Sequence, residues 1–414
     1  MKKIFKITGI ILLILAAGIF GFTYIAYISW SPGEIEASTD PSALKYFQNS
    51  YVECRAAFRA NGEKLKEKFD SVEVFALPVE NRGNDDLTID FCYIPGQSEK
   101  SKLLIISSGI HGIEGFTGSA IQNMLMDQFN NPEIFSGTGI LIIHAMNPFG
   151  FRNMRRVTEN NVDLNRNCDT DKALFSSENQ GYSELKEFLN PQNKANPGST
   201  GNKFFLLTAI EKLVQKSMKA LRQAVLQGQY QYPDGLYFGG KDFEPQVKSV
   251  TPILIKYAAE YESVMNIDLH TGYGELGILH LFPNPVDNPD IKTEMERIFS
   301  GYAINWGDSD DFYTINGAFS DYIGALMPGK FFIPMTFEYG TLNSQTTLGS
   351  IHSIHNMILE NQGFHYGYKN AAAEEKIGQT FRKMYYPSSE AWRSKVMNDT
   401  KKMMDQVFEK FNGL

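Results

Sequence analysis

The chain has 414 residues, enough for one large domain or two ordinary ones, and its 43% hydrophobic content excludes an intrinsically disordered protein. A net charge of −8 without any basic stripe argues against a nucleic-acid partner. Three cysteines without a C-x-x-C spacing are too few for a disulfide scaffold, and we expect buried or isolated thiols.

The N-terminal segment differs in character from the rest of the chain. Three lysines precede an uncharged, apolar run over residues 7–30, and about 20 apolar residues can cross a bilayer as a helix. A cleaved signal peptide is the alternative, with small residues at 16–18 as its cleavage site, but the apolar run continues well beyond them. We predict an N-terminal transmembrane anchor or signal segment over residues 1–30. Its positive flank would stay cytoplasmic, leaving the rest membrane-anchored in the periplasm or outside the cell, or secreted after cleavage.

The chain beyond a polar linker at 31–42 shows strand-like runs that alternate with helical patterns. An amphipathic helix is predicted over 43–69, where apolar residues recur at helical spacing. The strand-like runs are 72–77, 88–93, 103–107, 139–144, 263–269, 277–281 and 331–338, and later helical patterns are 205–226 and 348–360. This alternation predicts an α/β fold with a mixed, largely parallel β-sheet sandwiched by helices.

Residues 169–250 look like an insertion into this alternation. They contain a Pro/Asn/Gly-rich piece, NPQNKANPGSTGN, and a Gly- and Tyr-rich piece, QGQYQYPDGLYFGG. Long insertions beside strand ends often form lids or substrate walls, but loops also tolerate insertion at little cost in free energy. A lid and a surface excursion without a role therefore both stay open. We expect one domain over 43–385, followed by a helical tail over 386–414.

Polar clusters follow four of the strand-like runs directly, where ligand sites of open α/β sheets lie. In the first, His111 and Glu114 follow the run at 103–107 in the glycine-rich sequence SSGIHGIEGFTGS. Imidazole and carboxylate are good zinc ligands, and glycines let the backbone bend so that both can reach one ion. A capping or hydrogen-bonding role is the alternative for this pair.

The second cluster is DLHTG, in which His270 ends a strand and Asp268 precedes it on the same face. A carboxylate beside a ligating histidine can hold its tautomer and orientation. A lone histidine here would more often be a satisfied core residue. The order of the clusters along the chain therefore carries more weight than either pair alone.

The third and fourth clusters supply charge for substrate binding and proton transfer. Arginines and asparagines follow the run at 139–144 in NPFGFRNMRRVTENNVDLNRN, and such groups can bind a carboxylate or stabilise an oxyanion. Glu338 closes an apolar strand in FFIPMTFEYGT, where a carboxylate is costly unless paired or functional. It could act as a general base on a metal-activated water. A solvated loop and an edge carboxylate are the respective alternatives.

Taken in order, these motifs resemble the M14 zinc carboxypeptidase family. The matching motifs are H-x-x-E at 111–114, D-x-N-R-N at 163–167, D-x-H-[ST] at 268–271, T-F-E at 336–338, and the segment with Tyr313, Gly317, Asp321 and Tyr322. The wording HGIEG, NNVDLNRN, DLHTG and FEYGT is most similar to the bacterial DUF2817 branch, and the resemblance covers residues 71–362. It implies the zinc carboxypeptidase fold, a phosphorylase/hydrolase-like sandwich, over a catalytic domain at 43–385.

The resemblance implies a role for each matching residue. His111, Glu114 and His270 would bind one Zn²⁺ ion and leave an open position for water. Glu338 would take a proton from that water and deliver it to the leaving amine. The residues implied to handle the substrate are Arg156 at the scissile carbonyl, Asn165 and Arg166 at the terminal carboxylate, and Tyr313 closing over the bound end.

Three features depart from the family's pattern. Cys168 stands where many members have an aromatic residue, and the insertion at 169–250 lengthens the stretch between Glu114 and His270. Ser320 is small and neutral in the segment that shapes the family's side-chain pocket, which gives no support for a basic-residue preference. Peptide length and side-chain preference therefore stay open.

Three functions are compatible with these residues. The leading one is hydrolysis of a peptide or amide bond beside a free carboxylate, and the second is an N-acyl amino-acid deacylase similar to the aspartoacylases. The third, of another class, is a metal-free binding protein on the same fold, which predicts loss of ligands or base, and all are present. A serine hydrolase is disfavoured because no G-x-S-x-G elbow occurs.

Overall fold

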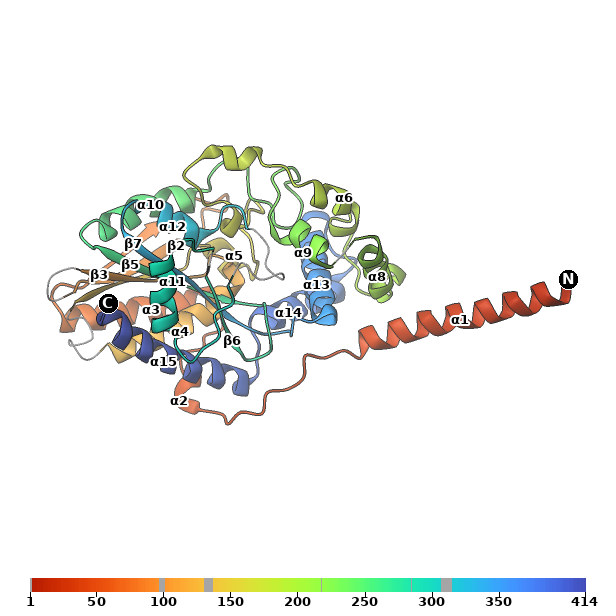
Figure 1. The fold of residues 1–414 in the computed structure, drawn as a ribbon, viewed down its shortest axis with the longest axis horizontal. Helices are drawn as coiled ribbons and strands as arrows, with labels where there is room; N and C mark the ends of the chain where they lie inside the picture. The colour runs from red at the N-terminus through yellow and green to blue at the C-terminus, as the bar shows by residue number, and fades with distance from the viewer. Residues whose placement is uncertain (1, 97–100, 130–136, 217, 284, 307–314) are drawn as a thin grey trace.

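The structure is a computed structural model that describes residues 2–96, 101–129, 137–216, 218–283, 285–306 and 315–414. Tyr313, which the family resemblance assigns to closing over the substrate, lies outside the described residues. The described chain folds around one β-sheet with helices on both faces and a further group of helices at one side (Figure 1).

The sheet has seven strands in the order β1-β2-β4-β3-β5-β7-β6. The strands are β1 Glu73–Pro78, β2 Thr88–Ile94, β3 Lys102–Ser108, β4 Thr138–His144, β5 Ser263–Thr271, β6 Leu279–Phe282 and β7 Phe331–Tyr339. The central strands β4, β3, β5 and β7 run parallel, whereas β1, β2 and β6 pair antiparallel at the two edges. This confirms the predicted mixed, largely parallel sheet sandwiched by helices.

Apolar side chains fill both faces of the sheet, which explains why the central strands read as nearly continuous hydrophobic runs. One face packs on α3 Tyr51–Lys68, α4 Gly115–Gln128, α11 Pro289–Ile298 and α15 Glu390–Asn412. The opposite face packs on α5 Pro148–Arg152, α10 Pro245–Ala258 and α12 Phe319–Ala325. The C-terminal helix α15 buries Trp392, whose indole N–H donates to the carbonyl of Gly340.

The predicted element boundaries were wrong at three places. The helix expected over 43–69 is divided into α2 Pro41–Leu44 and α3, because Ser50 and Glu53 form a capping box that starts α3 at Tyr51. The helix expected over 205–226 is divided at Lys216, which has extended backbone. The strand expected at 277–281 starts only at Leu279, since Gly277 has a φ of +76°.

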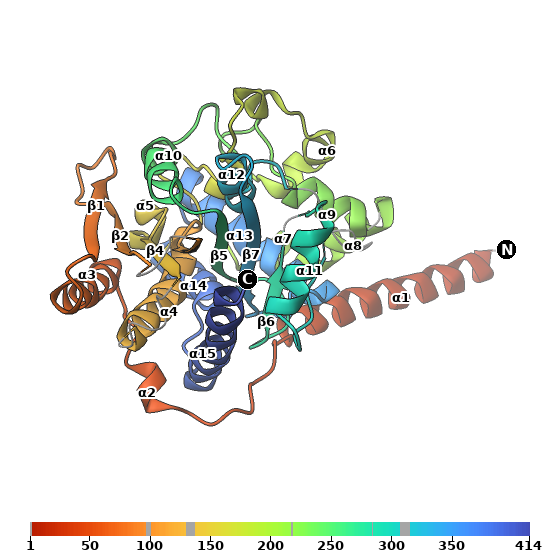
Figure 2. The ribbon, with the colours of Figure 1, turned by 60° about the vertical axis from the view of Figure 1, so that its left-hand side comes forward.

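Five of the remaining described helices form a third apolar cluster beside the sheet. They are α6 Gln180–Leu189, α8 Phe205–Gln215, α9 Met218–Leu226, α13 Thr347–Tyr366 and α14 Ala371–Tyr385, and the short helix α7 Thr200–Lys203 precedes α8. Helices α6, α8 and α9 come from the insertion at 169–250 and lie against α13 in both ribbon views (Figures 1 and 2). All three cysteines are buried and free, which confirms the expectation of isolated thiols.

Helix α1 (Lys2–Ile28) projects away from the rest of the molecule (Figures 1 and 2). Its segment Ile10–Ile28 has a mean hydropathy of 2.3 and is only 12% buried, so it is long and apolar enough to cross a membrane. Its last turns contact the third cluster, where Tyr27 is buried against Phe205 of α8. A signal sequence has the same length and composition.

Candidate metal centre

The three candidate ligands lie at adjoining ends of parallel strands. β3 and β5 are neighbours although β4 intervenes in the chain, so the strand order reverses at this point, where open α/β sheets place their ligand sites. His270 is the second-to-last residue of β5, and it lies opposite Glu338 of the neighbouring strand β7. His111 and Glu114 follow β3 in a short loop and a 3₁₀ turn, Gly112–Glu114.

Two glycines allow this loop to bring His111 and Glu114 together. Gly109 has a φ of +65°, which disfavours residues with a side chain. At Gly112 a Cβ atom would lie 2.2 Å from the backbone of Gly150, so only glycine permits this close approach. The glycine-rich sequence therefore meets two separate steric requirements, a positive φ at Gly109 and a close backbone approach at Gly112.

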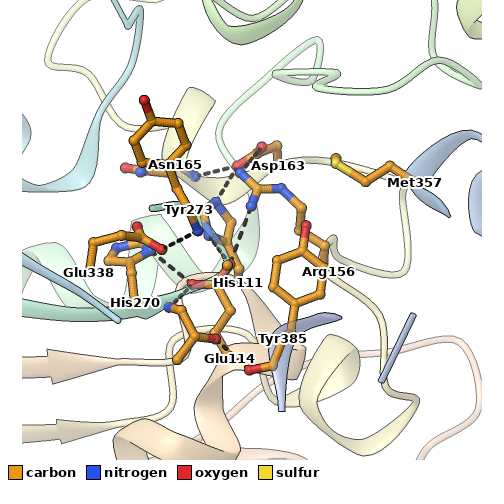
Figure 3. A network of polar contacts seen from close by, with 12 residues as sticks. His111, Glu114, Arg156, Asp163, Asn165, His270, Tyr273, Glu338, Met357 and Tyr385 are labelled. Atoms are coloured by element: carbon orange, nitrogen blue, oxygen red, sulfur yellow. Dashed lines mark hydrogen bonds and ion pairs between the residues drawn. The ribbon is translucent and has the colours of Figure 1, made fainter. Parts of the chain in front are cut away.

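The ligand atoms of His111, Glu114 and His270 converge on one buried point (Figure 3). All lie within 4.8 Å of one another. The Nδ1 atoms of His111 and His270 lie 2.9 and 3.0 Å from the two carboxylate oxygens of Glu114. The ligands of a tetrahedral zinc site, bound at roughly 2.1 Å, lie about 3.4 Å apart, so these two distances would widen by only about 0.4–0.5 Å around a zinc ion.

Each histidine is held from behind by a carboxylate. Asp163 Oδ1 lies 3.1 Å from Nε2 of His111, and Asp268 Oδ2 lies 2.6 Å from Nε2 of His270. Ser107 donates to the other oxygen of Asp268 at 2.7 Å and fixes it. A carboxylate at Nε2 places the ring proton there and leaves the Nδ1 lone pair facing the centre, as a metal ligand requires.

This arrangement fits a cation and is unfavourable without one. Two Nδ1 lone pairs and a carboxylate would face one another across a buried space, and Nδ1 of His111 has no hydrogen-bond partner in the described part of the molecule. The site also gathers the carboxylates of Glu114, Asp163, Asp268 and Glu338 against two guanidinium groups, those of Arg156 and Arg166. The set is thus positioned for a divalent metal ion.

The protonation preferences of the ligands reflect this crowding. Burial opposes a charge on Glu114, but the two histidines outweigh it and hold the pKa of its carboxyl well below the usual range. Burial likewise opposes a charge on His270, but Asp268 and Glu114 raise the pKa of its imidazole well above the usual value. The raised pKa of His270 shows the negative potential of the surrounding carboxylates, and the lowered pKa of Glu114 shows that positive charge at the centre stabilises its carboxylate.

Glu338 lies half-buried on the neighbouring strand and faces the same space (Figure 3). Its Oε1 accepts a hydrogen bond from the backbone N–H of Tyr273 at 2.9 Å. Burial and the charge of Glu114 raise the pKa of Glu338 to about 8. A carboxylate with a raised pKa beside a metal site has the proton affinity that a general base near neutral pH needs.

Arg156 reaches the ligands from the side of Asp163. It donates to Glu114 at 3.3 Å and to Asp163 at 3.0 Å, while its buried Nε has no partner among the described residues. The guanidinium groups of Arg156 and Arg166 both lie near the ring of Tyr237, at 5.2 and 5.5 Å from its centroid. Cation–π attraction to this one ring helps to hold the two like charges near each other.

Asn165 and Arg166 lie at the same cavity but are partly engaged. Asn165 accepts from the backbone N–H of Phe319 at 2.9 Å. Arg166 donates to the carbonyl of Leu226 at 2.9 and 2.6 Å and to that of Asn165 at 2.7 Å. In the part of the chain that the structure describes, these donors bond carbonyl oxygens and no carboxylate, so the positive charge of Arg166 stays available to an anion.

A cavity of about 510 Å³ joins these groups. Every described residue that the sequence assigned to the site lines it: His111, Glu114, Arg156, Asn165, Arg166, Asp268, His270 and Glu338. Of the positions that depart from the family's pattern, Ser320 lines the cavity and donates to Asn266 at 2.7 Å. Cys168 is buried with its thiol directed to the carbonyl of Leu164.

Sequence reasoning missed the roles of Asp163, Tyr237 and Tyr273 at this site. Asp163 was part of a motif but had no function of its own, although a buried carboxylate between a histidine and an arginine is a strong signal once contacts are known. Tyr237 has a φ of +54°, an unusual backbone state for a tyrosine, within the Gly- and Tyr-rich piece of the insertion. That composition was the only trace of it in the sequence.

Comparison with known proteins places the chain in a family. Residues 47–399 match the family described as "Protein of unknown function (DUF2817)". The chain belongs to the DUF2817 family. This confirms the resemblance inferred from the motif wording, and no curated protein matches the sequence.

Among solved structures, bovine thrombin-activatable fibrinolysis inhibitor is similar to this DUF2817 protein with 15% identity and a TM-score of 0.43, over 77% of this chain and 97% of that one. Carboxypeptidase A from Helicoverpa armigera has 14% identity and a TM-score of 0.40, over 87% and 79%. An aspartoacylase family protein from Mesorhizobium loti has 14% identity and a TM-score of 0.34, over 72% and 68%.

Proposed function

We propose that this DUF2817 protein is a zinc-dependent hydrolase that cleaves a peptide or amide bond beside a free carboxylate. The observation that carries the proposal is the convergence of His111, Glu114 and His270 on one buried point, with Glu338 facing it from the next strand. When bound, a zinc ion would polarise the scissile carbonyl and activate water for attack. The remaining groups of the cavity have chemistry that matches this reaction.

Glu338 is the general base in this proposal. Its raised pKa comes from burial and from the negative charge of Glu114. A cation on Glu114 would offset part of that charge, so the carboxylate would be available at neutral pH. Glu338 would take a proton from the attacking water and deliver it to the leaving nitrogen.

The two arginines would bind different negatively charged groups of the substrate. Arg156 adjoins the metal ligand Glu114 and has an unpartnered Nε, which suits it to stabilise the oxyanion that develops on the scissile carbonyl. Arg166 has no carboxylate partner among the described residues and would hold the free carboxylate of the substrate with Asn165. Tyr237, whose ring contacts both guanidinium groups, would help to keep these binding points at a fixed separation.

An N-acyl amino-acid deacylase is the second candidate and would use the same groups. Its substrate also combines an amide bond with a nearby carboxylate. The observation that favours it is the apolar lining that the insertion adds to the cavity, including Leu213 and Leu221. A metal-free binding protein is disfavoured, because all three candidate ligands are present and converge on one buried point with Glu338 beside them.

The proposal is tested by metal analysis and by activity on peptide and N-acyl amino-acid libraries. The full chain should hold one zinc ion, His270→Ala should lose it, and Glu338→Gln should keep the zinc but lose turnover. Glu360→Gln is a control, since Glu360 pairs with Arg155 away from the ligands. Full turnover by Glu338→Gln, or no bound zinc in the unmodified chain, would overturn the proposed mechanism.

We also propose that α1 anchors the protein with its catalytic domain outside the cytoplasm. The length and apolarity of Ile10–Ile28 support a single span, and the lysines before it would stay on the cytoplasmic side. Phosphatase and fluorescent-protein fusions at Leu414 should report an extracytoplasmic C-terminus. Activity of the cytoplasmic reporter alone would reverse this topology.

A further inference from the structure

The cavity has an apolar chamber beyond the metal centre. Helices α6, α8, α9 and α13 contribute its walls, and all but α13 come from the insertion. The lining that these helices contribute is mostly apolar, with Lys212, Arg222, Ser350 and Ser353 as its polar members. Its aliphatic side chains include Leu185, Leu213, Leu221, Val225, Ile354 and Met357. Apolar walls around an open space point to an apolar occupant.

The walls suit a hydrocarbon better than a peptide. All four are helices, whose backbone N–H and C=O groups bond within their own helix and offer a peptide backbone no partners. A buried peptide would leave its own polar groups unpaired, at a cost in free energy for each one. An alkyl chain needs no such partners, and burial of each methylene favours binding.

The chamber begins where the charged part of the cavity ends. Arg166 donates to the carbonyl of Leu226, the last residue of α9, so a guanidinium group marks the boundary. Tyr237 lies beside that guanidinium group and directs its hydroxyl to the sulfur of Met357 on α13 at 3.6 Å. A ligand that fills the whole cavity would therefore have a negative head near Arg166 and an apolar body between the helices.

The outer side of the same walls contacts helix α1. Phe205 of α8 and His355 of α13 stack on each other at 3.9 Å, and Tyr27 of α1 contacts both. Phe204 packs on Tyr24 one turn earlier along α1, with ring centroids 5.5 Å apart. Helices α8 and α13, which line the chamber, therefore also contact α1.

We propose that the substrate is a long-chain N-acyl amino acid, whose acyl chain occupies this chamber after entering from the membrane surface. The inference rests on the proposed function and on α1 as an anchor. Water adds to the amide carbon, the carbon–nitrogen bond breaks, and a fatty acid and a free amino acid are released. The water's proton passes through Glu338 to the leaving nitrogen, so no oxidant or further reactant is needed.

The test measures binding separately from turnover. The full chain carrying Glu338→Gln is placed in lipid nanodiscs and titrated calorimetrically with acetyl-, hexanoyl-, decanoyl- and tetradecanoyl-glycine, with empty nanodiscs as the partition reference. Affinity should rise with chain length by roughly two- to fourfold per methylene until the chamber is filled. Equal affinity across the series would overturn the inference.

Two neighbouring residues on α8 provide a matched pair of variants. Leu213 lines the chamber, whereas Val214 is 83% exposed on the same helix. Leu213→Trp should remove most of the chain-length dependence, and Val214→Trp should leave it unchanged. If Leu213→Trp fails to fold, Leu221→Trp on α9 tests the same wall. An unchanged dependence in the folded chamber variant would refute the chamber as the binding site.

Turnover of the unmodified zinc-loaded chain on the same series separates the two proposals. Hydrolysis of acetylglycine or short peptides, with no gain for longer acyl chains, would keep the proposed function and overturn the acyl-chain inference. Length-dependent binding without hydrolysis of any member would support the chamber and overturn the proposed function. Preference for long peptides over acylglycines would assign the chamber to peptide residues and also refute the inference.

Discussion

Asp163→Asn should show how far Asp163 orients the candidate metal ligand His111 and how far it holds Arg156. The carboxylate of Asp163 contacts Nε2 of His111 at 3.1 Å, Nη2 of Arg156 at 3.0 Å and the backbone N–H of Asn165 at 3.0 Å. Burial opposes its charge, but Arg156 and His111 outweigh that effect and hold the pKa of Asp163 well below its usual range. The group is therefore an anion shared by three donors.

An asparagine of the same shape has one oxygen where the aspartate has two. If its NH₂ group faces His111, two donors oppose each other and the histidine loses its fixed tautomer. If the NH₂ group faces Arg156, the arginine loses its partner instead. Loss of one buried hydrogen bond to a charged group costs roughly 1.5–3 kcal/mol, and loss of a carboxylate behind a ligating histidine weakens metal binding by roughly ten- to a hundredfold.

The assay is a competition titration of zinc against a chromophoric chelator, combined with initial rates at saturating zinc. Asp163→Asn should weaken zinc binding, lower turnover at saturating zinc, or do both, depending on the orientation of the amide. Asp90→Asn is the matched control, because Asp90 is also buried but bonds Arg59 and Thr88. Wild-type zinc affinity together with wild-type turnover in Asp163→Asn would refute this reasoning.

Three further predictions concern stability, measured on the full chain in detergent. Burial lowers the pKa of His144 to about 3, so below about pH 6.5 the unfolded chain takes up a proton that the folded chain refuses. This residue should lower the free energy of unfolding by up to about 1.4 kcal/mol for each pH unit below that point, until about pH 3. Urea titrations at several pH values should therefore give a shallower pH dependence for His144→Gln than for the unmodified chain, and an equal dependence would contradict this. Free zinc at about a hundred times its dissociation constant should raise the free energy of unfolding by about 2.7 kcal/mol in calorimetry, and a similar rise in His270→Ala would argue against this ligand. Trp392→Ala should cost roughly 3–5 kcal/mol in urea unfolding, and a loss below about 1 kcal/mol would mean that α15 is not part of the core.

The strands and the three residues that converge at the candidate metal centre could be predicted from the sequence, because both depend on short-range patterns. An apolar run that stops at a polar residue marks a strand end, and parallel strands place those ends side by side. His270 and Glu338 are 68 residues apart, yet the register of β5 with β7 makes them neighbours. Each appeared in the sequence as the polar residue that ends an apolar run.

Of the two carboxylates behind the histidines, Asp268 could be predicted from its spacing of two residues from His270 on one strand. The contact of Asp163 could not be predicted, because it joins segments that have no shared pattern. Asp163 meets His111 across 52 residues, and its selection over nearby acidic residues depends on the path of the loop. The break between α2 and α3 was missed for a different reason. The helical spacing of apolar residues continues through residues 45–50, and only the capping box of Ser50 and Glu53 shows that a new helix starts at Tyr51.

The insertion at 169–250 is joined to the site too closely to be a surface excursion. Phe238 accepts from the backbone N–H of Asp163 at 2.8 Å, and Leu226 accepts from the side chain of Arg166. Tyr230 donates to the carbonyl of Arg166 at 2.8 Å, so the segment that carries Arg166 is held from both directions. The sheet register fixes His270 and Glu338 independently of these contacts, whereas His111 is supported by Asp163, which the insertion holds through Phe238. We therefore expect changes in the insertion to affect Arg166 and Asp163 directly and to leave His270 and Glu338 in place.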